Sequence, residues 1–391
     1  METVERLTEQ EALAAKKMWS EIFYEDSEQF TDYYFAEKMA DNTGYGLKED
    51  GVLCSMLFLT PYRGAVCAPD RKGARFQEIP LSYIVGVGTR QAYRRRGYMG
   101  RLLVTALADL HRAGQPFAFL MPADPAIYTP YQFRYIYDRP VYTVLKKASG
   151  ADNAHKVKES VMEEGEAEAL AAFANRELER RFQLFLRRDG AYYRRAQKES
   201  RAMNGEVYLW KKEGEIVGFY LYARENQTEE IQEAMVREDM ALPGLLHISE
   251  KTRPIIMGRI TNVVSMLSLL RLESGASVEQ ITICFRLRDD LIKEHNATFL
   301  WTVGKKESTI AVSEEEEMAE ACTEIGALTA FVFGRADCRA CFLAGGGQKA
   351  ALSGGGKEPV WGECAAEKED AVFEKLARIK SLTRLCINEI V

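Results

Sequence analysis

The sequence predicts an α+β protein with more than one domain. Its 391 residues are too many for one ordinary hydrophobic core and suggest two or three domains. Hydrophobic residues make up 47% and charged residues 28%, which is typical of a globular, soluble chain. Hairpin patterns and helical patterns follow each other along the chain, so we expect sheets and helices within the same domains.

The N-terminal part has the pattern of a hairpin followed by strand, basic loop, helix and strand. Apolar runs on both sides of a Lys-Glu-Asp-Gly turn predict a β-hairpin over 44–62. Residues 81–89 are apolar and small, as a buried strand should be. Apolar residues then recur at helical spacing from Leu102 to Leu110, and Gly114 stops the run. The other expected elements are two helices over 8–40, a buried strand over 117–121, a loop with a short helix, and a strand from about Tyr135.

A second hairpin pattern indicates a middle domain. Residues 146–160 are polar and are interpreted as a linker. Residues 206–223 repeat the hairpin of 44–62 around a Lys-Lys-Glu-Gly turn, again with helical sequence before it. This likeness favours an internal copy of the N-terminal fold without an arginine-glycine loop. Hairpins are common, so a coincidental likeness is the alternative.

A third region begins near residue 253. Its apolar residues at helical spacing predict a helix within 253–272. They are Met257, Ile260, Val263, Val264, Leu267 and Leu270. Two strands, "ITICFRLRDD" and "ATFLWTV", and helices near 318–334 and 370–385 are expected to complete a small α+β domain ending at Val391.

The stretch Tyr93–Gly100, "YRRRGYMG", is a local basic segment in a chain of net charge −6. The N–H groups of the first helical turn lack partners within the helix and carry partial positive charge, which suits a diphosphate. Glycines at 97 and 100 allow close approach, and one or two of the three arginines would add charge-assisted hydrogen bonds. The acidic net charge favours a small anionic ligand over a nucleic acid. A solvated basic helix start is the alternative.

In this setting, the loop resembles the acyl-CoA loop of the GNAT superfamily of N-acetyltransferases. The family pattern, Arg/Gln-x-x-Gly-x-Gly/Ala between a strand and a helix, is matched by Arg94 and Gly97. Met99 departs from the usual small residue, although Gly100 follows it. The strand "VGVGT" before the loop and "FAFLM" after the helix strengthen the resemblance.

The whole chain resembles the enhanced intracellular survival (Eis) family, on "YRRRGYMGRLL", "AIYTPYQF", "MGRITNVVSML" and the end "INEIV". The resemblance implies an N-terminal GNAT domain over 1–148, a central degenerate GNAT-like domain over 149–285 and a sterol-carrier-protein-like domain over 286–391. A helix from about residue 255 would lead into the third domain. Family members form hexamers, which the resemblance implies here.

Acetyl-CoA is the co-substrate that the resemblance implies. The strand residues before the loop would bind the pantetheine arm and the thioester, and the loop backbone would bind the diphosphate. The residues at the end of the next strand would lie along the cofactor. The residues implied are Val87, Gly88, Thr89, Arg94, Arg95, Arg96, Gly97, Tyr98, Met99, Gly100, Ala123 and Asp124.

Direct attack of an amine on the thioester needs a base for its proton and an acid for the thiolate. The resemblance assigns the acid to Tyr128 in "AIYTPYQF", since a tyrosine is protonated at neutral pH. Gln132 departs from the glycine expected there. The base would be the terminal carboxylate of Val391, and the apolar end "LCINEIV" suits an interior position. The alternatives are a core tyrosine and an ordinary terminal segment.

The acceptor amine is the least determined part. "EIFYEDSEQF" mixes acidic and aromatic residues, and Phe23, Glu25 and Asp26 are candidates for holding a cationic acceptor such as an aminoglycoside or another polyamine. A solvated acidic face is the alternative. A second class of function is a lipid or hydrophobic-ligand carrier with a vestigial acetyltransferase domain, against which the intact loop and Tyr128 argue.

Other features favour a metal-free protein in the cytoplasm that binds neither nucleic acid nor membrane. "CRAC" (338–341) lacks two further zinc ligands, since no histidine follows His295. The glycine-rich stretch "GGGQKAALSGGGKEP" fails the P-loop spacing. The N-terminus has no signal-peptide pattern, and the eight cysteines are interpreted as reduced thiols.

Overall fold

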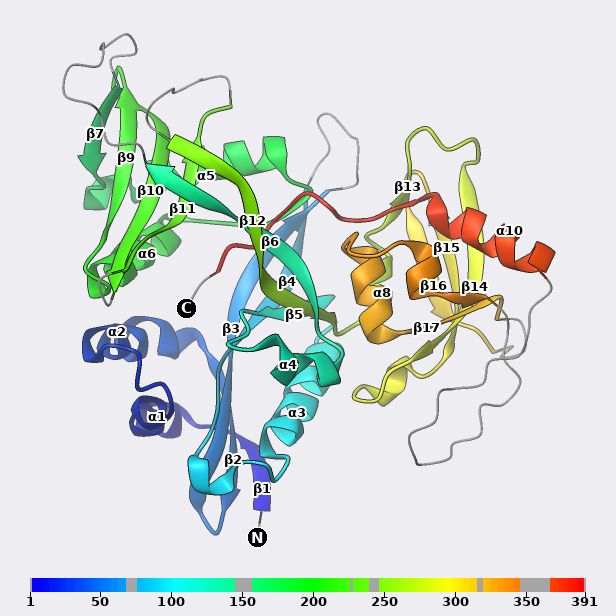
Figure 1. Ribbon diagram of the computed structural model, residues 1–391, viewed down its shortest axis with the longest axis horizontal. Coiled ribbons are helices and arrows are strands. Elements are labelled where there is room, and N and C mark those ends of the chain that lie inside the picture. The colour runs from blue at the N-terminus through cyan, green and yellow to red at the C-terminus, as the bar shows by residue number, and fades with distance from the viewer. Residues whose placement is uncertain are drawn as a thin grey trace.

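The computed structural model describes residues 2–67, 76–144, 157–225, 228–238, 246–314, 319–344 and 366–389. Figure 1 shows three parts: an N-terminal domain from blue to cyan, a middle domain in green, and a C-terminal domain from yellow to red. The middle and C-terminal domains flank the upper end of the N-terminal one (Figure 1).

The N-terminal domain is a sheet with helices on both faces. Its elements are β1 (Glu2–Arg6), α1 (Glu9–Ile22), α2 (Glu28–Tyr33), a π-helical turn (Tyr34–Lys38), β2 (Thr43–Glu49), β3 (Val52–Val66), β4 (Gln77–Thr89), α3 (Tyr98–Arg112), β5 (Phe117–Leu120), α4 (Pro125–Tyr128) and β6 (Arg134–Val144). The predicted helices, hairpin and strands of this part are confirmed. The hairpin turns at Asp50 and Gly51, whose φ angles of 50° and 80° suit the Asp-Gly pair.

Local sequence explains where the helices of this domain begin and which face they bury. Thr8 and Glu11 form a capping box at the start of α1. The helix α3 buries the predicted apolar stripe of Leu102, Leu103, Ala106, Leu107 and Leu110 against the sheet. On the opposite face, Trp19 of α1 packs beside Tyr34 and against Phe58 of β3.

The middle domain repeats the first half of the N-terminal domain. It contains β7 (Val157–Val161), α5 (Ala167–Arg181), β8 (Leu184–Leu186), α6 (Gly190–Ala202), β9 (Glu206–Lys212), β10 (Glu215–Glu225) and β11 (Thr228–Val236). Apart from β8, which lies between the two helices and pairs with β3, a strand, two helices and three antiparallel strands follow in the order seen from β1 to β4, which supports the predicted internal copy. Residues 157–160 of the predicted linker belong to β7, and the rest of that segment lies outside the described residues.

The long strand β12 (Leu246–Ile260) leaves the middle domain and enters the sheet of the first. The main path of that sheet is β1-β2-β3-β4-β5-β12-β6, and its β4–β5 pair is parallel. The predicted helix from about residue 255 is therefore wrong at its start, because 255–260 belongs to β12 and α7 is only Val263–Leu267. Residues 255–260 at the end of β12 are buried and mostly apolar, and their pattern runs into that of the short helix.

The C-terminal domain has the predicted α+β character. Its elements are α7, β13 (Arg271–Leu272), β14 (Gln280–Arg288), β15 (Thr298–Gly304), β16 (Ser308–Val312), β17 (Ala321–Glu324), α8 (Ile325–Val332), α9 (Cys338–Cys341), β18 (Leu343–Ala344), α10 (Ala366–Ala377), β19 (Ile379–Lys380) and β20 (Leu385–Cys386). The main sheet has the order β16-β15-β14-β17-β18. The start of the helix expected over 318–334 is wrong, because residues 321–324 form β17 beside β14. Its likeness to sterol carrier protein stays a prediction.

Polar contacts, some of them fully buried, join the C-terminal domain to the first sheet. Arg259 of β12 is fully buried and donates to the carboxylate of Asp289 at 2.5 Å. His295 lies 2.8 Å from the other oxygen of the same carboxylate. The guanidinium of Arg335 forms an ion pair with Asp138 of β6 at 2.7 Å. These contacts fix the position of the third domain against the strand β12.

Candidate active site

The strands β4 and β5 separate soon after they meet. Their parallel pairing covers Ser82 with Ala118 and Tyr83 with Phe119, and β4 then continues to Thr89 without β5. On its other side, β4 stays paired with β3, where the register shifts between Val85 and Gly88. A bulge of this kind bends a strand and increases its twist. The open edge of β4 therefore offers unpaired backbone groups to an extended ligand.

Gly86 makes the bulge possible. Its φ is +59°, and a Cβ atom there would lie 2.4 Å from the Trp19 ring. We expect Gly86→Ala to lower the free energy of unfolding by about 2–4 kcal/mol, because strain and overpacking add. Chemical denaturation would measure the change. Gly51→Ala is the matched control, since Gly51 has a φ of +80° with no atom within 4 Å of a built Cβ. Equal losses in the two variants would contradict the predicted clash.

The end of β4 is held by side-chain hydrogen bonds. The hydroxyl of Ser55 on β3 donates to the carbonyl of Gly88 at 3.0 Å and lies 2.8 Å from the hydroxyl of Thr89. The guanidinium of Arg94 donates to the carbonyl of Thr89 at 3.1 Å. Val87 is half-buried. The predicted thioester strand therefore has a fixed backbone.

The basic loop turns sharply into α3. Arg95 and Gly97 have φ angles of 63° and 77°, and Gly97 is the residue before the helix. No side chain caps this N-terminus, and the first helical hydrogen bond runs from the N–H of Arg101 to the carbonyl of Gly97 at 3.1 Å. The preceding N–H groups, those of residues 98–100, have no carbonyl within the helix to bind. This uncapped turn, next to the open edge of β4, is suited to an anion.

The three arginines of the loop have different surroundings. Arg96 donates to Glu49 at 3.2 Å and lies over the Tyr93 ring at 5.3 Å, while Arg94 is held by Thr89. Arg95 is exposed and forms no hydrogen bond or ion pair with the part of the chain that the structure describes. Of the three, Arg95 is thus the one whose guanidinium is uncommitted.

Contacts within the protein explain the residue types at two other positions of the loop. The hydroxyl of the buried Tyr98 lies 2.9 Å from a Glu2 carboxylate oxygen and 3.0 Å from a Glu49 one, and it donates to one of them, so only its backbone N–H is available to a ligand. A Cβ atom on Gly100 would lie 2.7 Å from the hydroxyl of Tyr131. Gly100 is therefore needed for packing, besides any contact with a cofactor. Met99 is half-buried and packs against the apolar cluster that the buried face of α3 forms with the sheet.

Tyr128 ends the short helix α4, which begins after the β5 strand. The Asp124 carboxylate accepts a hydrogen bond from the Ala126 N–H at 2.8 Å and so caps this helix, with Ala123 just before it. Tyr128 is buried against Phe133, with ring centroids 5.9 Å apart. Burial raises the pKa of Tyr128 to about 12. Gln132, where a glycine was expected, has a left-handed φ of 65°, which explains the expectation.

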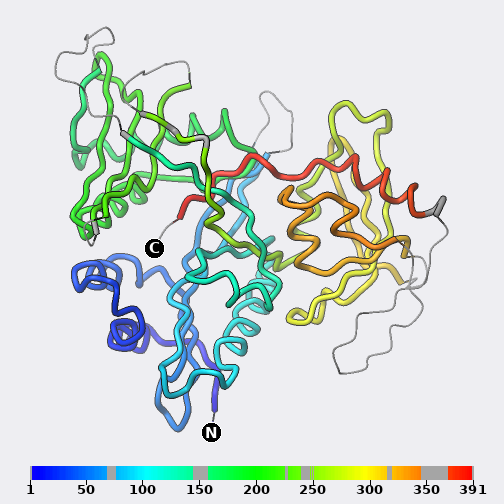
Figure 2. The backbone as a smooth tube through the Cα atoms, in the orientation of Figure 1, coloured from blue at the N-terminus to red at the C-terminus, as the bar shows by residue number. Residues whose placement is uncertain are grey.

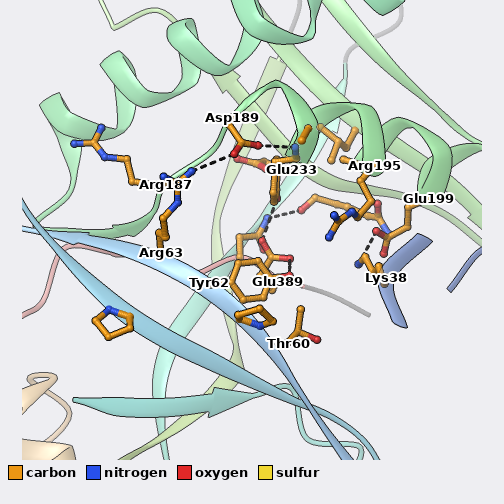
Figure 3. A pocket seen from close by; sticks show the side chains of 18 of the residues that line it. Lys38, Thr60, Tyr62, Arg63, Arg187, Asp189, Arg195, Glu199, Glu233 and Glu389 are labelled. Atoms are coloured by element: carbon orange, nitrogen blue, oxygen red, sulfur yellow. Dashed lines mark hydrogen bonds and ion pairs between the residues drawn. The ribbon is translucent and has the colours of Figure 1, made fainter. Parts of the chain in front are cut away.

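A cavity of 670 Å³ lies between β3, β4 and the middle domain. Figure 3 shows Tyr62 and Glu389 at its centre, with Lys38 and Glu199 on one side and Arg63 and Asp189 on another. Its lining residues are Lys38, Thr60, Pro61, Tyr62, Arg63, Glu78, Ile79, Pro80, Arg187, Asp189, Ala191, Tyr192, Arg195, Ala196, Glu199, Leu221, Gln232, Glu233, Asn388 and Glu389. We call it the tail cavity, because the last described residues enter it.

The C-terminal segment reaches this cavity from the third domain. Figure 2 shows it, in red, running back between the first two domains. The side-chain oxygen of Gln183 accepts from the backbone N–H groups of Thr383 and Arg384 at 3.2 and 3.0 Å, and β20 then pairs in parallel with β8. The Asn388 amide donates to the carbonyl of Gln232 at 2.9 Å. Val391 itself lies outside the described residues.

Glu389 is held inside the tail cavity by two tyrosines. The hydroxyls of Tyr62 and Tyr192 donate to its carboxylate at 2.7 and 3.1 Å. Burial raises the pKa of Glu389 above its usual range, although the nearby Lys38 opposes the shift.

Packing connects the tail cavity to the separation of β4 and β5. The ring of Phe119 on β5 lies 6.0 Å from Tyr62 and 5.3 Å from Tyr83. Burial raises the pKa of Tyr83. Tyr83 and the lining residue Tyr62 thus pack on the same ring of β5.

The predicted acceptor residues lie elsewhere. Phe23 packs on Trp19 with ring centroids 4.8 Å apart, and the Trp19 indole donates to Asp26 at 2.8 Å. Burial raises the pKa of Asp26. Glu25 is exposed. None of the three lines the tail cavity, whose residues Tyr62 and Glu389 the sequence analysis missed. The sequence feature that could have pointed to Glu389 is a single carboxylate in an apolar terminal segment.

Residues 3–136 match the model of the family described as "Acetyltransferase (GNAT) domain". The chain is similar over its full length to three solved structures, each also covered completely. They are a probable N-acyltransferase from Enterococcus faecalis (TM-score 0.75, 14% identity), a GCN5-related N-acetyltransferase from Anabaena variabilis (0.73, 12%) and Eis1 from Mycobacterium abscessus (0.66, 13%). At these identities the likeness is one of fold. The sequence matches no curated protein.

The residues that the structure describes were searched for membrane-spanning helices and for groups of metal ligands. Within them, no helix has the length and apolar character needed to cross a membrane. No group of three or more potential metal ligands occurs in the same residues, and Cys338 and Cys341 are buried free thiols. The glycine-rich stretch at 345–359 lies outside the description.

Proposed function

We propose that this protein, which carries a GNAT acetyltransferase domain at its N-terminus, moves the acetyl group of acetyl-CoA to a small-molecule amine. The observation that carries the proposal is the open edge of β4 that continues into the uncapped N-terminus of α3. An extended chain with a diphosphate at one end matches this combination of strand edge and helix start.

Acetyl-CoA would lie along residues that the fold brings together. The backbone of Val87, Gly88 and Thr89 would bind the pantetheine and thioester part, and the N–H groups of residues 95–100 the diphosphate. Arg95 would add a charge-assisted hydrogen bond, since its guanidinium has no described partner. Ala123 and Asp124, at the end of β5, would flank the same ligand.

The chemistry is direct attack of a neutral amine on the thioester carbon. The C–N bond forms and the C–S bond breaks, and the thiolate takes the hydroxyl proton of Tyr128. The acetylated nitrogen has one proton in excess, and its loss to a base allows Tyr128 to be protonated again. The acceptor would come from the tail cavity, whose lining residue Tyr62 packs on Phe119 of β5 with ring centroids 6.0 Å apart.

The base in this proposal is the terminal carboxylate of Val391, as the family resemblance implies. Its support is the anchoring of the segment up to Glu389, two residues earlier, in the tail cavity. We expect one added residue after Val391 to lower kcat at least about tenfold, because the carboxylate moves by up to ~3.5 Å. Activity and thermal unfolding of the extended protein would be compared. If the activity falls only because part of the extended protein is unfolded at the assay temperature, the catalytic role is contradicted.

The test of the class is thiol release from acetyl-CoA across a panel of aminoglycosides, simple polyamines and monoamines. Release with any amine supports the acetyltransferase. If acetyl-CoA fails to bind, the proposal is wrong, and lipid binding by the full chain would examine the alternative carrier function. Aminoglycoside acceptors, a hexameric assembly and a cytoplasmic location are further proposals that rest on the family resemblance.

A further inference from the structure

We infer that the third domain positions Tyr128 through a buried pair, Arg259 and Asp289, which holds the segment that joins β5 to β6. Residues 121–133 form this segment, called here the acid-bearing segment because it carries the predicted acid at the end of α4. The inference rests on the proposed function, since it concerns how the acid of that reaction is held. Arg259 acts through the backbone of the segment, so it is a positioning residue.

The topology of the first sheet places Arg259 against the acid-bearing segment. β12 lies between β5 and β6, so the segment bridges β12 as it runs from one of these strands to the other. At the crossing, Arg259 is paired with Ala118 of β5. Its neighbour Gly258 is paired with Arg134 at the start of β6. The Nε–H of Arg259 donates to the carbonyl of Tyr131 at 2.9 Å, which ties the segment to the strand that it crosses.

The orientation of the Arg259 guanidinium is fixed on all sides. The side chain is fully buried. Besides Nε, its Nη1 donates to the carbonyl of Ile260 at 3.2 Å and its Nη2 to the carboxylate of Asp289 at 2.5 Å. All three nitrogens are thus engaged, and a planar guanidinium held at three points has little freedom to rotate. Nε can therefore keep the Tyr131 carbonyl in one place.

Asp289 brings the third domain into this contact. Its Oδ1 also accepts from the N–H groups of Leu291 and Ile292 at 2.8 and 3.1 Å, and its Oδ2 accepts from Nδ1 of His295 at 2.8 Å. Burial disfavours the charged carboxylate, but the hydrogen bond from His295 and the charge of Arg259 hold the pKa of Asp289 below its ordinary value. Asp289 is thus an ionised anchor whose own position is fixed by its domain.

A second contact from the third domain reaches the next residue of the segment. The side-chain amide of Gln132 donates to the carboxylate of Glu324 at 3.3 Å. A Cβ atom on Gly326 of α8 would lie 2.3 Å from the side-chain oxygen of Gln132, so this helix packs closely on the segment. Ile292 of the third domain also belongs to the buried cluster that contains Tyr128. The position of the Tyr128 hydroxyl therefore depends on the third domain.

Arg259→Lys tests the inference on the full chain. Lysine keeps a positive charge beside Asp289 but lacks the Nε–H donor and the planar guanidinium. We expect kcat in thiol release to fall about tenfold, because small displacements of a catalytic group are costly, while the Kd of acetyl-CoA in calorimetry stays within about threefold. Arg335→Lys is the matched control, since Arg335 joins the third domain to Asp138 of β6, and it should leave both quantities unchanged.

The same exchange in the Tyr128→Phe background separates positioning from general damage. If Arg259 acts through the hydroxyl of Tyr128, its replacement costs nothing further once that hydroxyl is absent, and kcat should change by less than about twofold. A tenfold fall in both backgrounds would overturn the inference, because a pair that only stabilises the fold lowers activity whether or not the hydroxyl is present.

Hydrogen exchange of the acid-bearing segment gives a readout that does not depend on activity. The N–H of Phe133 donates to the carbonyl of Tyr128 at 3.3 Å, and that of Gln132 to the carbonyl of Thr129 at 3.0 Å. We expect these two amides to exchange at least about fivefold faster in Arg259→Lys than in wild type, with α3 unchanged. Equal rates in the two proteins would refute the inference.

A second variant keeps the test decisive if Arg259→Lys does not fold. Glu324→Ala removes the acceptor of the Gln132 amide, and we expect about twofold faster exchange of the same two amides. Unchanged exchange there would also count against positioning by the third domain. Retained activity in Tyr128→Phe would remove the acid assignment of the proposed function, whereas the exchange rates would still decide whether the third domain holds the segment.

Discussion

Replacing Tyr128 by phenylalanine is expected to lower kcat by about two to four orders of magnitude while acetyl-CoA affinity stays within about threefold. The ring remains to pack against Phe133, and only the hydroxyl that protonates the departing thiolate is lost. Steady-state thiol release and calorimetry with acetyl-CoA would measure the two quantities. Tyr135→Phe is the matched control, since Tyr135 packs against the same buried cluster.

The pH profile gives an independent check on this tyrosine. Because burial raises the pKa of Tyr128 to about 12, the acid stays protonated over the range in which an ordinary tyrosine begins to ionise near 10. We expect kcat to show no alkaline decline from Tyr128 below pH ~11. Retained activity in Tyr128→Phe would move the acid to another group and leave the acetyltransferase class intact.

The second large effect concerns the start of α3. Gly97→Asp places a carboxylate next to the uncapped N–H groups, where it would bind them itself and repel a diphosphate. We expect acetyl-CoA binding to weaken about 100-fold. Gly97→Asn has the same size and the same left-handed strain, and it should weaken binding at least about tenfold less. Equal affinities of the two variants, measured by calorimetry, would show that no anion binds at this turn.

The sequence predicted the elements whose signals are local. The turns at Asp50–Gly51 and Glu213–Gly214 have positive φ angles, which the aspartate and the two glycines favour. The helix α3 was expected because its apolar stripe and its glycine start lie within one continuous stretch. The loop and the strand before it are also adjacent in the sequence, so both could be assigned to one candidate site. Tyr128 was carried by the family resemblance and remains a prediction.

The missed features depend on pairings between distant parts of the chain. β12 was taken for the start of a helix, because the two strands that cover it are more than a hundred residues away in the sequence. Glu389 and Tyr62 are 327 residues apart, and no local pattern joins them. The tail cavity has no sequence signature for the same reason. Its lining comes from β3, β4, the middle domain and the terminal segment.

The insertion of β12 has a consequence for the protein during its synthesis. When the ribosome has made residues 1–148, β5 and β6 lack the strand that pairs between them, and their backbone groups stay unsatisfied. The first sheet closes only after Ile260 has left the exit tunnel, and β20 joins β8 later still. The nascent N-terminal domain therefore exposes unpaired strand edges until most of the chain has been made, and such edges favour aggregation.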